Sequence, residues 1–148
     1  MDFNTVYAAP EESPGFLLWR VSTLWRRAIE AVLKPLDLTH PQFVVLATTG
    51  WLIKAQEKVS QADIGKLVSL DPNTTSQILR GLEIKKLITR SHSIDERSKY
   101  PKLTKEGSQR LSKALPLVEE ADAQFFSCID LNASGVLKAL QNLQRKAL

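Results

Sequence analysis

The sequence predicts a mainly α-helical chain of six helices that carries one small β-hairpin, the wing, between the fourth and fifth helices. Three observations predict this fold class. Apolar residues recur at steps of three and four over most of the 148 residues, which is the spacing of amphipathic helices. Residues that favour helix N-termini precede several of these segments. Only once, after residue 86, does the pattern change to that of two short strands.

The first two helices are delimited by proline and by a capping threonine. The first helix is predicted over residues 14–34, because Pro35 cannot continue it. Thr39 is expected to cap the second helix, which has Pro41 in its first turn. A polar linker, residues 54–58, is expected to follow.

The third and fourth helices have the clearest start signals in the chain. Ser60 and Asp63 have the S-x-x-D spacing of an acidic capping box, so a short helix is predicted to begin at Ser60. Asp71 can cap the free amides of the next helix, and Pro72 fits its first position. That helix is expected over residues 73–86.

Residues 87–91 and 100–104 have strand-like composition and flank a polar, turn-rich segment, so they are predicted to form the hairpin. Pro101 cannot donate to a strand ladder, which places the second strand at an edge.

The last two helices follow the hairpin. A long helix is predicted from residue 105 and is expected to bend at Pro116. The final helix is expected to begin at Asp130 or Asn132.

Length and composition exclude several classes of protein. The chain is long enough for one compact domain and too short for two ordinary ones. No apolar run approaches the roughly 20 residues that span a bilayer, and no secretory signal is recognisable, so a cytoplasmic protein is expected. A single cysteine, Cys128, excludes an intrachain disulfide and a cysteine-based metal site. No catalytic or phosphate-binding motif is found, so neither an enzyme nor a cofactor is expected.

The positive charge is concentrated in one segment. Of the net charge of +4, residues 73–105 carry eight Lys/Arg against three Asp/Glu, while the rest of the chain is nearly balanced. A basic block on a neutral body indicates a polyanion-binding face. On charge alone, a solvated basic surface is equally compatible.

The helix over residues 73–86 has an unusual polar side. That side is rich in short hydrogen-bonding residues, which lower helix propensity, where an ordinary surface helix would carry Glu and Lys. Asn and Gln can pair with adenine and Arg with guanine in the major groove, so DNA contact is favoured over an ordinary amphipathic helix. The residues expected to contact DNA are Asn73, Thr74, Ser76, Gln77 and Arg80.

The tip of the hairpin carries a second candidate DNA contact. Arg97 on a thin wing can enter the minor groove, and Asp95 can orient it by a charge-assisted hydrogen bond. Taken alone, a charged, solvated turn explains this tip equally well. The lysines expected to contact phosphates are Lys85, Lys86, Lys99, Lys102 and Lys105.

The order short helix, turn, second helix, basic hairpin is that of a winged helix-turn-helix. Residues 60–107 resemble the core of the MarR family of winged-helix regulators. The most specific marker is Asp95-Glu96-Arg97-Ser98 followed by Leu103-Thr104-Lys105-Glu106-Gly107. Other matching pieces are Val59-Ser60-Gln61-Ala62-Asp63-Ile64, Leu70-Asp71-Pro72-Asn73-Thr74-Thr75-Ser76, Leu82-Glu83, Leu87-Ile88-Thr89-Arg90 and Leu38-Thr39-His40-Pro41-Gln42-Phe43.

The resemblance implies a homodimeric repressor of transcription. Residues 14–34 and 105–148 would form the dimer, and residues 38–104 would form the winged helix-turn-helix that binds double-stranded DNA. The helix at 72–86 would read the major groove of a pseudo-palindromic operator, and Arg97 would enter the minor groove. A small lipophilic or phenolic effector, or an oxidant, releases many members from DNA.

Two residues depart from the family pattern. Lys86 stands where the family commonly has glycine, so the turn after the fourth helix is expected to differ. Gly81 lies inside that helix at an expected cost of about 1 kcal/mol relative to alanine.

Alternative functions depend on a few other residues and on the fold itself. Cys128 could act as a redox sensor, although a structural role is favoured. His40 and His92 have no ligand spacing, so a metal site is not expected. The tryptophans could line an effector pocket, although core or dimer-interface positions are favoured: Trp19, Trp25 and Trp51. A winged-helix protein-interaction module without sequence-specific DNA binding is the remaining alternative.

Overall fold

The computed structural model describes residues 4–55, 58–92, 99–130 and 134–146. The chain divides into two compact units, which are described separately. Unit 1 consists of Met1–Ala28 and Glu119–Leu148, and unit 2 is Ile29–Val118.

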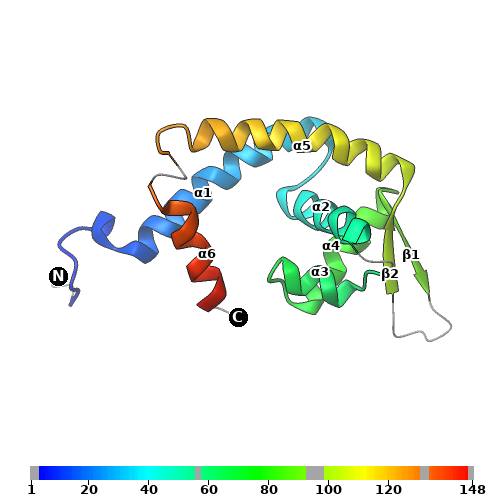
Figure 1. Cartoon of the computed structure of the whole chain (residues 1–148), viewed down its shortest axis with the longest axis horizontal. Coiled ribbons are helices and arrows are strands. Elements are labelled where there is room, and N and C mark those ends of the chain that lie inside the picture. Colours follow the sequence, from blue (N-terminus) through cyan, green and yellow to red (C-terminus); the bar gives the residue numbers. More distant parts are fainter. Residues whose placement is uncertain (1–3, 56–57, 93–98, 131–133, 147–148) are drawn as a thin grey trace. The chain divides into compact units, whose positions relative to one another are not determined.

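The described part of the chain holds six α-helices and one two-stranded antiparallel sheet, which confirms the predicted fold class (Figure 1). The elements are η1 (Pro10–Glu12), α1 (Pro14–Leu33), η2 (Lys34–Leu36), α2 (His40–Ala55), α3 (Gln61–Leu67), α4 (Pro72–Ile84), β1 (Ile88–His92), β2 (Lys99–Leu103), α5 (Lys105–Phe125) and α6 (Val136–Lys146).

The predicted helix starts of α2 and α3 are both confirmed by reciprocal capping. The Ser60 amide donates to Asp63 Oδ2 at 2.8 Å, and the Asp63 amide donates to Ser60 Oγ at 3.1 Å. At α2, the Gln42 amide donates to Thr39 Oγ1 at 3.3 Å, and the Thr39 amide donates to Gln42 Oε1 at 3.2 Å. Each pair satisfies two backbone donors that a helix N-terminus otherwise leaves open.

The predicted start of the last helix is wrong. Helix α6 begins at Val136, several residues after Asp130, and Asn132 lies outside the described residues. The Ser134 amide donates to the Asp130 carbonyl at 2.8 Å. Gly135 then adopts a left-handed φ of 72°, which interrupts the helical backbone, so the continuous helix starts only after it.

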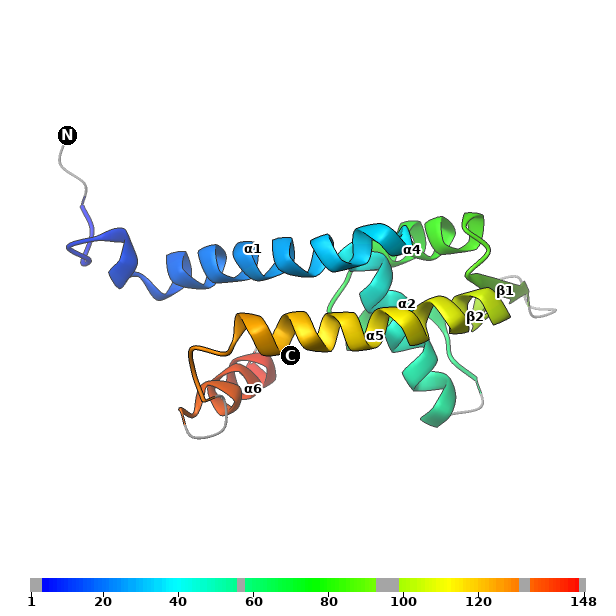
Figure 2. The ribbon, with the colours of Figure 1, turned by 90° about the horizontal axis from the view of Figure 1, so that it is seen from above.

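The core of unit 2 lies among α2, α3, α4 and the hairpin. Helix α2 packs against α3, α4 and β2, and α4 packs against α3 and β1. Large apolar side chains that are fully buried include Leu46, Ile64, Leu79, Leu82 and Ile88. In the hairpin, Arg90 pairs with Pro101, and β2 leads directly into α5 (Figure 2).

The turn after α4 is the left-handed cap that glycine usually forms, so the expected difference is not found. Lys86 has a φ of 58°. Its amide donates to the Glu83 carbonyl, and the Leu87 amide donates to the Leu82 carbonyl, both at 2.9 Å. These two bonds are the Schellman pattern, and the buried Leu82 and Leu87 provide the apolar side chains that usually accompany it.

The start of α5 explains the L-T-x-x-G motif. Thr104 Oγ1 accepts a hydrogen bond from the Gly107 amide at 2.9 Å and donates to the Lys86 carbonyl at 2.8 Å. Gly107 packs so tightly that a Cβ atom there would lie 1.9 Å from the Leu87 carbonyl oxygen. The L-T-x-x-G motif therefore packs the start of α5 closely against the turn after α4.

Candidate nucleic-acid interface

The N-terminus of α4 is fixed by Asp71, as predicted. Its Oδ1 atom accepts hydrogen bonds from the Asn73 and Thr74 amides, each at 3.0 Å, and its Oδ2 atom accepts one from the Thr74 hydroxyl at 2.5 Å. The hydroxyl of Thr74, together with the backbone amides, lowers the pKa of the Asp71 carboxyl below its ordinary value.

Helix α4 separates a buried side from a polar outer side, as expected. The buried side consists of Thr75, Leu79 and Leu82. On the outer side, three predicted DNA contacts are exposed and two are half-buried: Asn73, Gln77 and Arg80, then Thr74 and Ser76. The outer side therefore presents amide and guanidinium groups that match base edges.

The hydroxyl of Thr74 takes part in the N-terminal cap of α4. Its hydroxyl hydrogen bonds to Asp71, so its oxygen retains only its accepting capacity. DNA phosphates are acceptors, so the hydroxyl of Thr74 cannot donate to one unless it leaves Asp71.

Lys85 hydrogen bonds to Asp37 and Gln42 within unit 2, a contact that was not predicted from the sequence. Its ammonium donates to the Asp37 carbonyl at 2.6 Å, to Asp37 Oδ1 at 2.9 Å and to Gln42 Oε1 at 3.1 Å. The hydrogen bond from Lys85 lowers the pKa of Asp37. Because three acceptors surround its ammonium, Lys85 is less available to a phosphate than the sequence predicted.

A second missed contact joins α4 to the hairpin. Arg90 Nε and Nη2 donate to Glu83 Oε2 at 2.9 and 2.5 Å, and the Arg90 side chain is almost fully buried. Within the described part of the chain, Arg90 Nη1 is buried without a hydrogen-bond partner. Glu83 and Arg90 both lie in segments that match the family pattern. This match was the only sign in the sequence that either residue has a specific role.

The other predicted cations fall into two groups. Lys86, Lys102 and Lys105 are exposed around the end of α4, β2 and the start of α5. Lys99 is the first residue of β2, and the structure describes its backbone but not its side chain. Asp95 and Arg97 lie outside the described residues. The outer face of α4 and these three exposed lysines all belong to unit 2.

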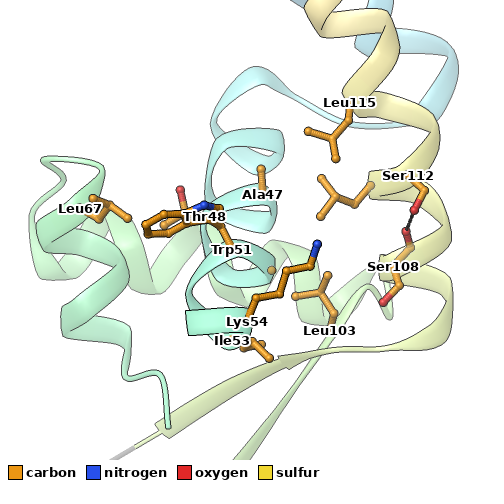
Figure 3. Close-up of a pocket in the computed structure, with 12 residues that line it drawn as sticks. Ala47, Thr48, Trp51, Ile53, Lys54, Leu67, Leu103, Ser108, Ser112 and Leu115 are labelled. Carbon is orange, nitrogen blue, oxygen red and sulfur yellow. Dashed lines mark hydrogen bonds between the residues drawn. The ribbon is translucent and has the colours of Figure 1, made fainter. Parts of the chain in front are cut away.

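A pocket of about 680 Å³ lies in unit 2 among α2, α3, β2 and α5 (Figure 3). Its walls are mainly apolar, and they include one cation, Lys54, whose amine extends toward α5 in the close-up. The lining residues are Ala47, Thr48, Gly50, Trp51, Ile53, Lys54, Leu67, Leu103, Ser108, Leu111, Ser112 and Leu115. Its walls include three elements of the predicted winged helix-turn-helix.

The tryptophans lie in three different environments. Trp51 lines the pocket and is 63% exposed, so of the two favoured positions, core or dimer interface, the core is excluded for this residue. Trp25 is half-buried in unit 1, where its Nε1 donates to Asp122 Oδ1 at 2.6 Å. Trp19 is exposed on α1, and Cys128 is exposed after α5, so neither belongs to the core of the chain.

Among the described residues, none of the helices combines the length and the apolar character that a membrane span requires. These residues also contain no cluster of three or more His, Cys, Asp or Glu side chains that could hold a metal ion.

Comparisons with known proteins agree on one family. The sequence model of the MarR family matches residues 38–99. The HTH-type transcriptional regulator YdcH of Bacillus subtilis (strain 168) is 34% identical over 144 residues, which cover 97% of each chain. The HTH-type transcriptional repressor Rv2887 of Mycobacterium tuberculosis (strain H37Rv) is 32% identical over 111 residues, covering 74% of this chain and 77% of the relative.

Solved structures add two ligand-bound states of similar proteins. The S. aureus MepR–DNA complex superposes with a TM-score of 0.77 at 26% identity, covering 92% of this chain and 98% of MepR. Rv2887 in complex with salicylic acid superposes with a TM-score of 0.63 at 28% identity, covering 89% of this chain and 96% of that structure.

Proposed function

This chain belongs to the MarR family of DNA-binding transcription regulators, and we propose that it is a repressor that binds a pseudo-palindromic operator as a homodimer. The observation that carries the proposal is the outer side of α4, where Asn73, Gln77 and Arg80 are exposed on a helix whose opposite side is anchored in the core. Repression is supported by the relative Rv2887, which is named a repressor.

Helix α4 enters the major groove in this proposal. Gln77 and Asn73 suit the adenine edge, Arg80 suits guanine, and Ser76 suits either a base or a phosphate. The exposed lysines Lys86 and Lys102 neutralise phosphates on either side, which makes binding salt-dependent. The structure of S. aureus MepR, a protein of similar fold, in complex with DNA supports DNA as the ligand.

The hairpin reaches the adjacent minor groove. Arg97 enters the minor groove, Asp95 orients its guanidinium, and Lys99 contacts the phosphate backbone. The sequence pattern Asp95-Glu96-Arg97-Ser98 supports these three roles, together with the antiparallel pairing of β1 with β2.

Dimer formation is supported by the apolar surface of unit 1. Large apolar side chains are exposed along α1 and α6, and exposed apolar patches of this kind mark protein interfaces. The exposed residues are Phe16, Leu17, Leu18, Trp19, Val21 and Leu24 on α1, and Leu137, Leu140 and Leu143 on α6.

Selection of tight-binding sequences from random DNA tests the proposal. The expected outcome is one pseudo-palindrome, bound more tightly than scrambled DNA of equal length. Gln77→Ala and Arg80→Ala should each lose about 1–3 kcal/mol of discrimination at one base pair per half-site. Lys113→Ala, which removes an exposed cation from α5, serves as the charge-matched control and should leave base preference unchanged. Identical motifs for all four proteins would remove α4 as the reader.

The pocket is proposed to bind a small apolar anion that weakens DNA binding. Its apolar walls accept a ring or chain, Lys54 pairs with an acid group, and α3 and β2 in the wall connect occupancy to the DNA-binding elements. The salicylic acid complex of Rv2887 supplies the probe.

Salicylate should therefore quench the fluorescence of Trp51 at the pocket wall and raise the Kd for the selected operator. Trp51→Phe should remove the quenching while leaving Trp19 and Trp25 as internal references. Quenching that persists in Trp51→Phe, or an unchanged operator Kd at saturating salicylate, would exclude this pocket as the effector site.

Two alternatives make opposite predictions. A protein-interaction module would show equal affinity for the selected palindrome and for scrambled DNA. A redox switch would release DNA on oxidation in the wild-type protein but not in Cys128→Ser, whose thiol is absent. An equal response of the two proteins to oxidant excludes the redox switch.

A further inference from the structure

The last residue of α4, Ile84, is 75% exposed. Among the exposed large apolar side chains of the described residues, only Val6 in the N-terminal arm is more exposed. Isoleucine is also a poorer helix former than leucine or lysine, because its branched side chain is restricted in a helix. Neither burial nor helix propensity accounts for isoleucine at this position.

Ile84 shares a face with the proposed base readers. The positions 73, 77, 80 and 84 are separated by four, three and four residues. At 3.6 residues per turn their side chains fall within an arc of about 60°, with Ile84 inside that arc. Thr75, Leu79 and Leu82 point to the opposite side, into the core. Ile84 therefore extends the outer face of α4 by one apolar side chain.

The dimensions of the groove allow both ends of this face to contact DNA. Asn73 and Ile84 are eleven residues apart, which corresponds to about 16 Å along a helix at 1.5 Å per residue. The major groove is about 12 Å wide, so a helix lying along it reaches several consecutive base pairs. The principal apolar group that bases present there is the C5 methyl of thymine.

We propose that Ile84 is a specificity-determining residue that packs against a thymine methyl group at one position of each half-site. Polar contacts from Gln77 and Arg80 select neighbouring bases, and Ile84 selects thymine by removing two apolar surfaces from water. The inference rests on the proposed function, because it requires α4 to lie in the major groove.

The test replaces thymidine by deoxyuridine, one position at a time, in the operator obtained by selection. Deoxyuridine keeps every hydrogen bond of thymidine and lacks only the methyl group. At the position that Ile84 contacts, the substitution should weaken wild-type binding about fourfold, the equivalent of one buried methyl group. In Ile84→Ala, the same substitution should have no effect at that position, while Ile84→Val should retain most of it.

Val6→Ala is the matched control, because it removes an exposed β-branched apolar side chain from the N-terminal arm, outside both proposed dimer segments, and should keep the wild-type pattern of deoxyuridine effects. Melting temperatures of all variants verify that the fold is intact. Coupling between Ile84 and one thymine methyl in a double-mutant cycle establishes the contact.

Two results overturn the inference and are distinguishable. If wild type binds its operator specifically but no thymine methyl couples to Ile84, the proposed function stands and the role of Ile84 is excluded. If wild type fails to distinguish the operator from scrambled DNA, the proposed function itself fails, and the inference fails with it.

Discussion

At the scale of single residues, the turn after α4 places a lysine in a conformation that favours glycine. Lys86 has a φ of 58°, where a Cβ atom approaches the following carbonyl oxygen. The two bonds of the Schellman pattern and the buried Leu87 hold the residue there. Because Lys86 is exposed directly after the C-cap of α4, the position combines backbone strain with a solvent-accessible cation at the end of the proposed recognition helix.

Lys86→Gly should therefore stabilise the fold and weaken DNA binding. Glycine relieves the left-handed strain of about 1–2 kcal/mol, and the greater freedom of the unfolded chain offsets about half of it. The net expectation is a gain of about 1 kcal/mol in the free energy of unfolding, measured by urea denaturation. Lys86→Ala removes the same charge but keeps the Cβ atom, so it should match Lys86→Gly in DNA affinity and show no gain in stability. If both variants gain equally in stability, the loss of the Lys86 charge, rather than relief of backbone strain, explains the gain.

Gly107 is the opposite case, a glycine required by close packing. A Cβ atom at this position would lie 1.9 Å from the Leu87 carbonyl oxygen, which is backbone and cannot rotate away. Gly107→Ala should lower the free energy of unfolding by about 3 kcal/mol, because α5 must shift from the α4 turn. Gly15→Ala on α1 is the control, since its added Cβ meets no atom within 4 Å and should not destabilise. Wild-type stability in Gly107→Ala would show that the start of α5 is adaptable.

At the scale of elements, features whose residues lie close together in the sequence were predicted better than features that depend on distant residues. The starts of α2, α3 and α4 were predicted because each depends on side chains within three residues of the capping position, such as Ser60 with Asp63. The start of α6 was not, since Asp130 and Asn132 look like caps and the left-handed Gly135 gives no distinctive sequence signal.

Contacts between distant elements lay beyond the sequence analysis. Lys85 and Asp37 are 48 residues apart, and only the packing of α4 against α2 brings them together. The pocket likewise combines side chains from four elements, so its existence depends on tertiary structure rather than on any one segment. The candidate DNA-binding face was predictable because all its α4 residues share one helix.

The cap of α4 makes the stability of this helix pH-dependent. The pKa of Asp71 in the folded protein is lowered below its ordinary value of 3.8 by the Thr74 hydroxyl and the backbone amides. The charged cap therefore stabilises the folded state above that pH, and this contribution is lost as the pH falls below 3.8 toward the folded-state pKa.

Asp71→Asn should isolate this effect, because asparagine caps helices about as well but carries no charge. The melting temperature of the wild type should exceed that of the variant at neutral pH, and the difference should shrink as the pH falls below 4. A difference that stays constant from pH 7 to pH 3 would contradict the role of the carboxylate.

At the scale of the whole molecule, the two units carry different kinds of surface. Unit 2 includes the whole of the basic segment 73–105 and the pocket, whereas unit 1 exposes apolar side chains on α1 and α6. This division supports the proposal that unit 2 contacts DNA and unit 1 self-associates, since charge attracts phosphate and apolar area drives association between protein chains.

Leu140→Glu tests that division, because it places a charge on the apolar side of α6 without altering unit 2. In sedimentation experiments the wild type should be a dimer and the variant a monomer. The variant should bind a full operator at least 100-fold more weakly, since two linked half-sites gain effective concentration. Binding to an isolated half-site should be unchanged. Asn142→Glu, on the polar side of the same helix, is the control and should remain dimeric. The opposite outcome is a wild-type chain that sediments as a monomer at micromolar concentration and still binds the full operator tightly. That result would show that the apolar side of α6 binds a partner other than a second copy of the chain.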